Sequence, residues 1–81
     1  MSQAPLIEKL RAGNHQAYKY IFDEYYASMC AVAFEYVQDY HISQNIAEDV
    51  MMSIWEKRES LNISVSIKAY LLGATRNRSI D

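Results

Sequence analysis

Residues 14–38, NHQAYKYIFDEYYASMCAVAFEYVQ, decide the fold class of this chain. Apolar and aromatic side chains recur in it at steps of three and four, which places them on one face of an α-helix. They are Tyr18, Ile21, Phe22, Tyr25, Met29, Val32 or Ala33, and Tyr36. Asn14 is a favourable N-cap, so the sequence predicts one amphipathic helix that ends near Val37 or Gln38. The aromatic rings on this face invite a base-stacking interpretation, but at helical spacing core packing is the favoured one.

A short helix is expected before this one, and a third helix after it. Ala4–Ala12 (APLIEKLRA) carries Pro5 near its first turn, where a missing N–H costs nothing. Residues 38–42 form a polar break, after which Ser43 is expected to cap a third helix that runs to about Glu59.

A connector at residues 61–65 (LNISV), rich in β-branched and capping side chains, leads to a fourth helix. Ser64 or Ser66 can cap that helix, and its apolar positions again step by three and four. These positions are Ile67, Tyr70, Leu71 and Ala74. One proline and two glycines leave few positions for the tight turns that join strands. We therefore predict an all-α fold, a compact bundle of about four helices that forms one domain over residues 1–81.

Composition and charge narrow the functional classes. The chain has 81 residues, 51% of them hydrophobic, and a single cysteine, Cys30, so a disulfide framework is excluded. No stretch is long and apolar enough to span a bilayer, and the sequence predicts a cytoplasmic protein without membrane insertion. Residues 1–62 hold five Lys/Arg against nine Asp/Glu, whereas residues 63–81 hold three against one. The C-terminal residues 63–81 therefore suit an anionic partner, whereas the acidic middle of the chain repels one.

The third segment has two chemically different faces on a helical wheel. Its apolar half consists of Ile46, Ala47, Val50, Met51, Ile54 and Trp55. Its polar half consists of Asn45, Glu48, Asp49, Met52, Ser53 and Glu56. Met52 lies at the centre of the polar half, and an adaptable thioether among hydrogen-bond acceptors is typical of a protein-docking patch. A single exposed methionine is also ordinary on a helix surface, so both interpretations stay open.

Catalytic and metal-binding chemistry finds no support in these residues. Glu48 and Asp49 are neighbours about 100° apart on a helix, so their carboxylates do not converge on one atom. His15 and His41 lie in different segments and lack a cysteine partner or a His-x-x-x-His spacing. The sequence has neither a glycine-rich phosphate loop nor a nucleophile motif. We therefore expect no enzyme, no metal and no cofactor.

The fourth segment, SIKAYLLGATRNRSID, carries a different chemistry. Three polar residues cluster near its end, Arg76, Asn77 and Arg78, with Lys68 two turns earlier and Tyr70 as an aromatic ring. Cations hold phosphates, an amide pairs with a base edge, and bases stack on rings, so this set suits a nucleic acid. An equally supported interpretation is that the cations only complement the dipole at a helix C-terminus and that Tyr70 belongs to the core.

Several motifs follow one another along the chain. They are Leu-x-x-Gly-Asn-x-x-Ala-Tyr at residues 10–18, the Tyr25-Tyr26 pair, Trp55-Glu-Lys-Arg, Ala69-Tyr-Leu and Arg76-Asn-Arg. Their order and spacing resemble the second conserved region of bacterial RNA polymerase sigma factors, closest to the extracytoplasmic-function group, over nearly all of residues 5–81. The resemblance implies an all-helical bundle that docks on the clamp coiled coil of the largest subunit in the polymerase core. The same domain recognises and melts the promoter minus-ten element by capturing flipped bases of the non-template strand.

The resemblance also implies which residues act. Polymerase docking falls on the third helix, at Asn45, Glu48, Asp49 and Met52. The DNA contacts fall on the last helix and the connector before it, at Asn62, Ser64, Lys68, Tyr70, Arg76, Asn77 and Arg78. An anti-sigma factor is the further partner implied. Sigma factors of this kind normally continue into a domain with a helix-turn-helix, so we expect residues 1–81 to be an isolated part of a longer chain.

The third helix departs from the family pattern. Counting without a gap from Trp55 puts the family's Ala-Glu-Asp-Ile-Val-Gln-Glu-Val run at residues 43–50, so the conspicuous Ala-Glu-Asp of this chain is a false register. The usual docking acid then falls on Asn45, the usual glutamine on Glu48 and the second acid on Asp49.

The main alternative is a helical protein-interaction module that keeps the fold and binds an anti-sigma factor or a polymerase subunit without recognising DNA. Gly73 bears on this choice, because the family commonly has arginine there and its loss takes one positive charge from the DNA helix. Salt-sensitive binding of a single-stranded minus-ten oligonucleotide separates the two hypotheses.

Overall fold

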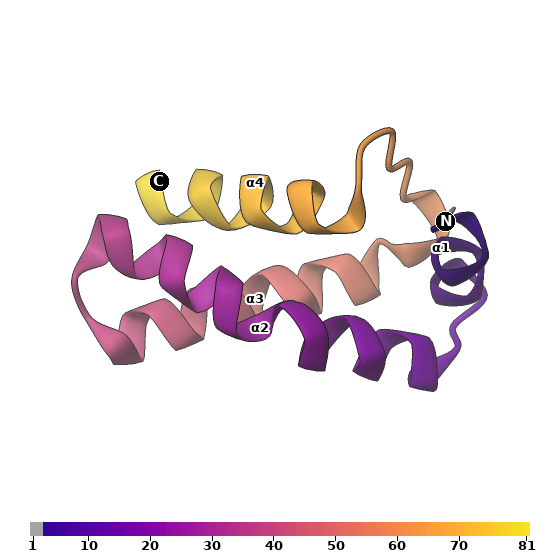
Figure 1. The fold of residues 1–81 in the computed structure, drawn as a ribbon, viewed down its shortest axis with the longest axis horizontal. Coiled ribbons are helices and arrows are strands. Elements are labelled where there is room, and N and C mark those ends of the chain that lie inside the picture. Colours follow the sequence, from indigo (N-terminus) through magenta and orange to yellow (C-terminus); the bar gives the residue numbers. More distant parts are fainter. Residues whose placement is uncertain (1–2) are drawn as a thin grey trace.

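The computed structural model describes residues 3–81, which fold into the all-α bundle that the sequence predicts. Its elements are α1 (Ala4–Arg11), α2 (His15–Val37), α3 (Tyr40–Glu56), a short 3-10 turn η1 (Arg58–Ser60) and α4 (Ile67–Ile80). No strand occurs within residues 3–81. α2 and α3 run antiparallel, α4 packs along both, and α1 lies at the end of the bundle where the connector enters α4 (Figure 1). The bundle measures 35 × 21 × 20 Å.

α2 has the limits that the sequence predicts. Asn14 Oδ1 accepts a 2.9 Å hydrogen bond from the backbone N–H of Ala17, which satisfies one of the free donors of the first turn. At the other end, Gln38 adopts a left-handed conformation with φ 56°, and its Nε2 donates to the Phe34 carbonyl over 3.1 Å. Gly13, with φ 83°, makes the turn between α1 and α2, a conformation that favours glycine.

α3 begins and ends earlier than predicted. Its N-cap is Asp39, whose Oδ1 accepts from the N–H of Ile42 over 2.9 Å, so most of the predicted polar break is helical. Ser43, the predicted cap, is fully buried instead, and its Oγ donates to the Asp39 carbonyl over 2.7 Å. The helix ends at Glu56, because the chain turns there into η1. The prediction that Ser43 caps this helix is therefore wrong, and Asp39 is the cap.

Replacing Asp39 by alanine should lower the free energy of unfolding by about 1 kcal/mol, because the first turn of α3 loses its side-chain acceptor. Ser43→Ala should cost less, since the Ser43 hydroxyl bonds to a carbonyl one turn earlier in the same segment. Urea denaturation followed by far-UV circular dichroism measures both changes. A larger loss for Ser43→Ala than for Asp39→Ala would contradict the assignment of the cap.

α4 is tied at its start to the N-terminal segment. Of the two candidate caps, Ser66 is the one used, and its Oγ accepts from the N–H of Ala69 over 3.0 Å. The N–H of Ile67 donates to Gln3 Oε1 over 2.8 Å, so a residue from the beginning of the chain satisfies a second free donor of α4.

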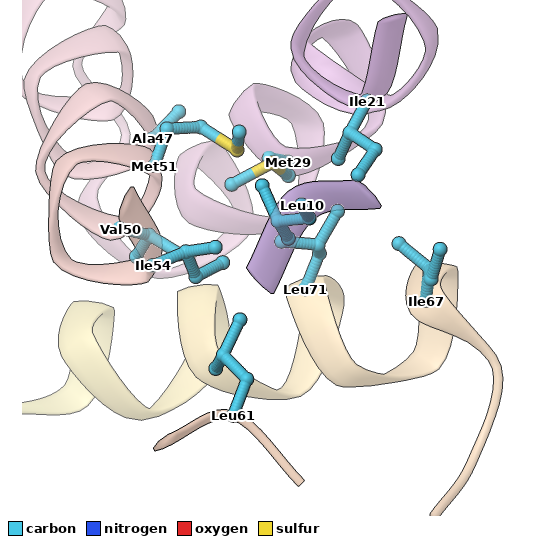
Figure 2. Close-up of a cluster of buried hydrophobic side chains, with 10 residues drawn as sticks. All are labelled: Leu10, Ile21, Met29, Ala47, Val50, Met51, Ile54, Leu61, Ile67 and Leu71. Carbon is cyan, nitrogen blue, oxygen red and sulfur yellow. The ribbon is translucent and has the colours of Figure 1, made fainter. Parts of the chain in front are cut away.

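One contiguous core joins the four helices and the connector (Figure 2). Its buried members are Leu10, Ile21, Met29, Ala47, Val50, Met51, Ile54, Leu61, Ile67 and Leu71. Tyr18, Phe22 and Tyr25 of α2 pack against this core, which confirms the packing interpretation for most of the aromatic face. Tyr36 departs from it, with 47% of its surface exposed. Among the helices of residues 3–81, none has the length and apolar character needed to cross a membrane.

Candidate functional site

The four predicted docking residues lie on one exposed face of α3. Asn45, Glu48, Asp49 and Met52 are all exposed and form what is termed here the α3 face. Met52 has 57% of its surface exposed, whereas its neighbour Met51 is completely buried in the core. The helical wheel therefore orients α3 correctly, although the helix begins earlier than predicted.

Tyr26 of α2 borders the α3 face and fixes one of its carboxylates. The Tyr26 hydroxyl donates to Glu48 Oε2 over 3.1 Å. Partial burial raises the pKa of Tyr26, and hydrogen bonds with Cys30 and Glu48 raise it further, so the phenol keeps its proton. Burial also raises the pKa of the Cys30 thiol, which disfavours a reactive thiolate. The contact between Tyr26 and Glu48 crosses two helices, and no local sequence pattern reveals it.

A hollow of about 190 Å³ continues the α3 face toward the start of α2, and His15, Tyr18, Met52 and Trp55 line it. The ring centroid of Trp55 lies 4.9 Å from that of His15 and 4.9 Å from that of Tyr18. Arg58 covers the same indole ring, with Cζ 4.4 Å from its centroid, which is a cation–π contact. His15 and Tyr18 join this surface only through the packing of α2 on α3, so no pattern within a single helix predicts them.

The two arginines predicted to bind DNA point to different sides of α4. Arg78 lies over α3, where its Nη2 is 3.2 Å from Asp49 Oδ2. Arg76 lies over α2, in a hollow of about 430 Å³ that Tyr36 and Gly73 also line. At Gly73 an added Cβ would find no atom within 4 Å, so the fold does not require glycine there. Arg76 and Arg78 therefore do not form one compact cationic cluster.

A pocket of about 290 Å³ between α3 and α4 gathers three of the predicted DNA-binding residues, Tyr70, Asn77 and Arg78. Ser53 and Lys57, from α3 and the residue after it, line the same pocket and were not predicted. Tyr70 is partly buried and packs against the core, which confirms the core interpretation, and the same residue also lines this pocket. The pocket places an aromatic ring, an amide and two cations within one concave surface.

The remaining predicted DNA-binding residues lie outside this pocket. Asn62 and Ser64 are exposed on the connector, and Lys68 is exposed in the first turn of α4. Ser64 borders a hollow of about 490 Å³ between the connector and α1, to which Gln3 and Ile7 also contribute. The seven residues thus follow a path along the connector and α4 rather than a single site.

The bundle thus places exposed acids on α3 and exposed cations along α4. Within residues 3–81, His, Cys, Asp and Glu side chains form no group of three that could hold a metal ion. The model of the sigma-70 region 2 family matches residues 21–81, so the chain belongs to this family. Region 2 is a non-catalytic domain of sigma factors that takes part in promoter recognition, and the family implies interaction with RNA polymerase core and promoter DNA. No curated protein and no solved structure matches the chain.

Proposed function

We propose that this domain docks through the α3 face on the clamp coiled coil of the largest polymerase subunit, and recognises and melts the minus-ten element with α4 and the connector. The observation that carries the proposal is the placement of two chemically different surfaces on adjacent helices in a member of the sigma-70 region 2 family. The extracytoplasmic-function assignment, a cytoplasmic location and an anti-sigma partner belong to the same proposal and rest on the motifs of the sequence.

The charge and the shape of the α3 face support docking on a basic protein surface. No lysine or arginine occurs between Ile21 and Glu56, so every Asp, Glu, Lys or Arg of α3, and of α2 after Ile21, is acidic. Glu48 is held in place by Tyr26, and Met52 supplies an adaptable apolar contact beside the hollow at Trp55. A partner with lysine or arginine around an apolar centre complements this surface.

The pocket between α3 and α4 supports capture of an unpaired base. A flipped base can stack on the ring of Tyr70, while the amide of Asn77 offers both a donor and an acceptor to the base edge. Lys57 and Arg78 at the same pocket, with Lys68 and Arg76 elsewhere along α4, can hold the phosphates of the strand. Base capture of this kind favours the melted strand over the duplex, because a paired base cannot enter the pocket.

Binding of a fluorescent single-stranded minus-ten oligonucleotide tests this function. The double variant Arg76→Ala/Arg78→Ala should bind more weakly than the parent, and its slope of log affinity against log salt should fall by about 0.7 for each phosphate that the variant no longer neutralises. The matched control is Lys9→Ala/Lys19→Ala, which removes two exposed cations of α1 and α2 and should change affinity less. Salt-independent binding, or equal losses in both double variants, would contradict DNA recognition by α4. Capture of the clamp coiled coil without any oligonucleotide binding would favour the protein-interaction module instead.

A further inference from the structure

A further concave surface lies between α2 and α3, near the turn that joins them. It has a volume of about 480 Å³ and is termed here the α2–α3 groove. The side chains that line it, besides two exposed alanines of α2, are Tyr26, Cys30, Phe34, Tyr40, Ser43 and Gln44. A volume of this size and a mainly apolar and aromatic lining are typical of sites for small organic molecules.

An open aromatic wall bounds the groove. The rings of Phe34 and Tyr40 are stacked, with centroids 4.5 Å apart and an angle of 19° between their planes. Tyr40 has 76% of its surface exposed, so one face of its ring packs on Phe34 while the other is open to solvent. A planar ring can extend this stack, and a cation can lie against it, because the face of an aromatic ring attracts positive charge.

The hydroxyl groups of the groove leave acceptors rather than donors for a ligand. The Ser43 hydroxyl donates its proton to the Asp39 carbonyl over 2.7 Å, and the Tyr26 hydroxyl donates its own to Glu48 Oε2 over 3.1 Å. Each hydroxyl has one proton and two lone pairs, so both oxygens retain only acceptor capacity. The Gln44 amide adds both a donor and an acceptor. A ligand with N–H groups therefore finds more partners here than a ligand that carries only acceptors.

The charge around the groove selects against anions. No described residue that lines it is basic, and no lysine or arginine occurs between Ile21 and Glu56. Exposed acids occur along α2, α3 and the turn between them, at Glu35, Asp39 and Glu48. A cation therefore meets a favourable field at this surface, whereas a carboxylate or a phosphate meets an unfavourable one.

We propose that the α2–α3 groove binds a small aromatic cation, a planar ring that carries a protonated or quaternary amine. The ring stacks on the open face of Tyr40, and the amine lies in the acidic field beside the acceptors of Tyr26 and Ser43. The site is separate from the proposed function, because no described residue that lines the groove belongs to the α3 face or to the predicted DNA-binding set.

Three probes with the same indole ring and two-carbon chain test the class of ligand: tryptamine is cationic, 3-ethylindole is neutral and indole-3-propionate is anionic. Each is titrated into the full 81-residue domain, and the amide chemical shifts of isotope-labelled protein give the affinity and the residues affected. Tryptamine should bind about two- to fivefold more tightly than 3-ethylindole, the gain expected of an exposed cation–π contact, and should shift the amides of Phe34, Tyr40 and Gln44. Indole-3-propionate should bind most weakly. Equal affinities for tryptamine and indole-3-propionate, or shifts that avoid these amides, would overturn the proposal.

Two substitutions test the site without entering the core. Tyr40→Ala removes the open ring and should weaken tryptamine binding by about two- to tenfold, the contribution of one aromatic pair. Its matched control is Tyr20→Ala, which removes another exposed tyrosine of α2, outside the groove. Ala31→Leu fills the groove from an exposed helical position and should abolish binding, while the melting temperature stays near that of the parent. Equal losses in the two tyrosine variants, or unchanged binding by Ala31→Leu, would contradict the site.

Sedimentation equilibrium tests the main competing occupant of the groove, a second copy of this chain. The expected result is a monomer for both the parent and Ala31→Leu, with tryptamine bound by the parent alone. A dimer of the parent that Ala31→Leu dissociates would show that the groove is an interface between copies, and would overturn the proposal.

Discussion

Met51→Ala should lower the free energy of unfolding by about 2–5 kcal/mol, whereas Met52→Ala should change it by no more than about 0.5 kcal/mol. The two residues are adjacent, but Met51 is completely buried in the core (Figure 2) and Met52 has 57% of its surface exposed. Truncating Met51 removes buried methylene and thioether groups from the core and leaves a cavity where α3 meets the other helices. Thermal and urea denaturation of the two variants measure the difference, and for a domain of this size Met51→Ala can be enough to unfold it.

The same pair separates stability from docking. Met52→Ala should weaken capture of the clamp coiled coil while its melting temperature stays near that of the parent, because the side chain contributes to the α3 face and little to the core. Similar destabilisation by both substitutions would show that α3 is oriented differently. Undiminished capture by a stable Met52→Ala variant would move the docking surface elsewhere.

Tyr70→Ala should reduce the affinity for the single-stranded minus-ten oligonucleotide by about five- to 100-fold, since stacking on an aromatic side chain is worth about 1–3 kcal/mol per base. Tyr70→Phe should retain most of the affinity, because the ring remains and the pocket between α3 and α4 keeps its aromatic wall. Fluorescence anisotropy titrations, run well below the melting temperature of each variant, give the affinities.

Partial burial of Tyr70 requires a matched control. Leu72→Ala serves, because Leu72 is also partly buried against the core but borders the hollow on the opposite side of α4. It should lower stability by an amount similar to Tyr70→Ala and leave oligonucleotide binding near that of the parent. Equal losses of affinity in the two alanine variants would mean that Tyr70 acts only as a core residue.

Much of the fold was predictable because its signals are local. The three- and four-residue spacing of α2, with Asn14 before it and the end near Gln38, predicted its limits. The predicted start of α3 was wrong because a serine near the start of a helix can either cap it or lie buried within its first turns. Ser43 suits an N-cap, yet here it is a small buried residue, and Asp39 provides the cap one turn earlier.

The candidate site was predictable only where its residues lie on a single helix, because their spacing in the sequence then shows which of them share a face. The α3 face followed from the wheel, and its members are exposed together. The contacts of Glu48 with Tyr26 and of Asp49 with Arg78 join residues 22 and 29 positions apart, respectively. Such contacts depend on how α2, α3 and α4 pack, and no periodicity within a single helix encodes them. Their effect is to tie two acids of the predicted docking surface to neighbouring helices.

The open space at Gly73 has a consequence for the charge that α4 can carry. Because no atom lies within 4 Å of where a Cβ would be, the first carbon of a side chain there meets no steric obstacle. Replacing Gly73 by alanine or another good helix former should also stabilise α4 by about 1 kcal/mol. Position 73 is thus a place where a substitution that adds a charged side chain can change the charge of α4 without a compensating change in the core.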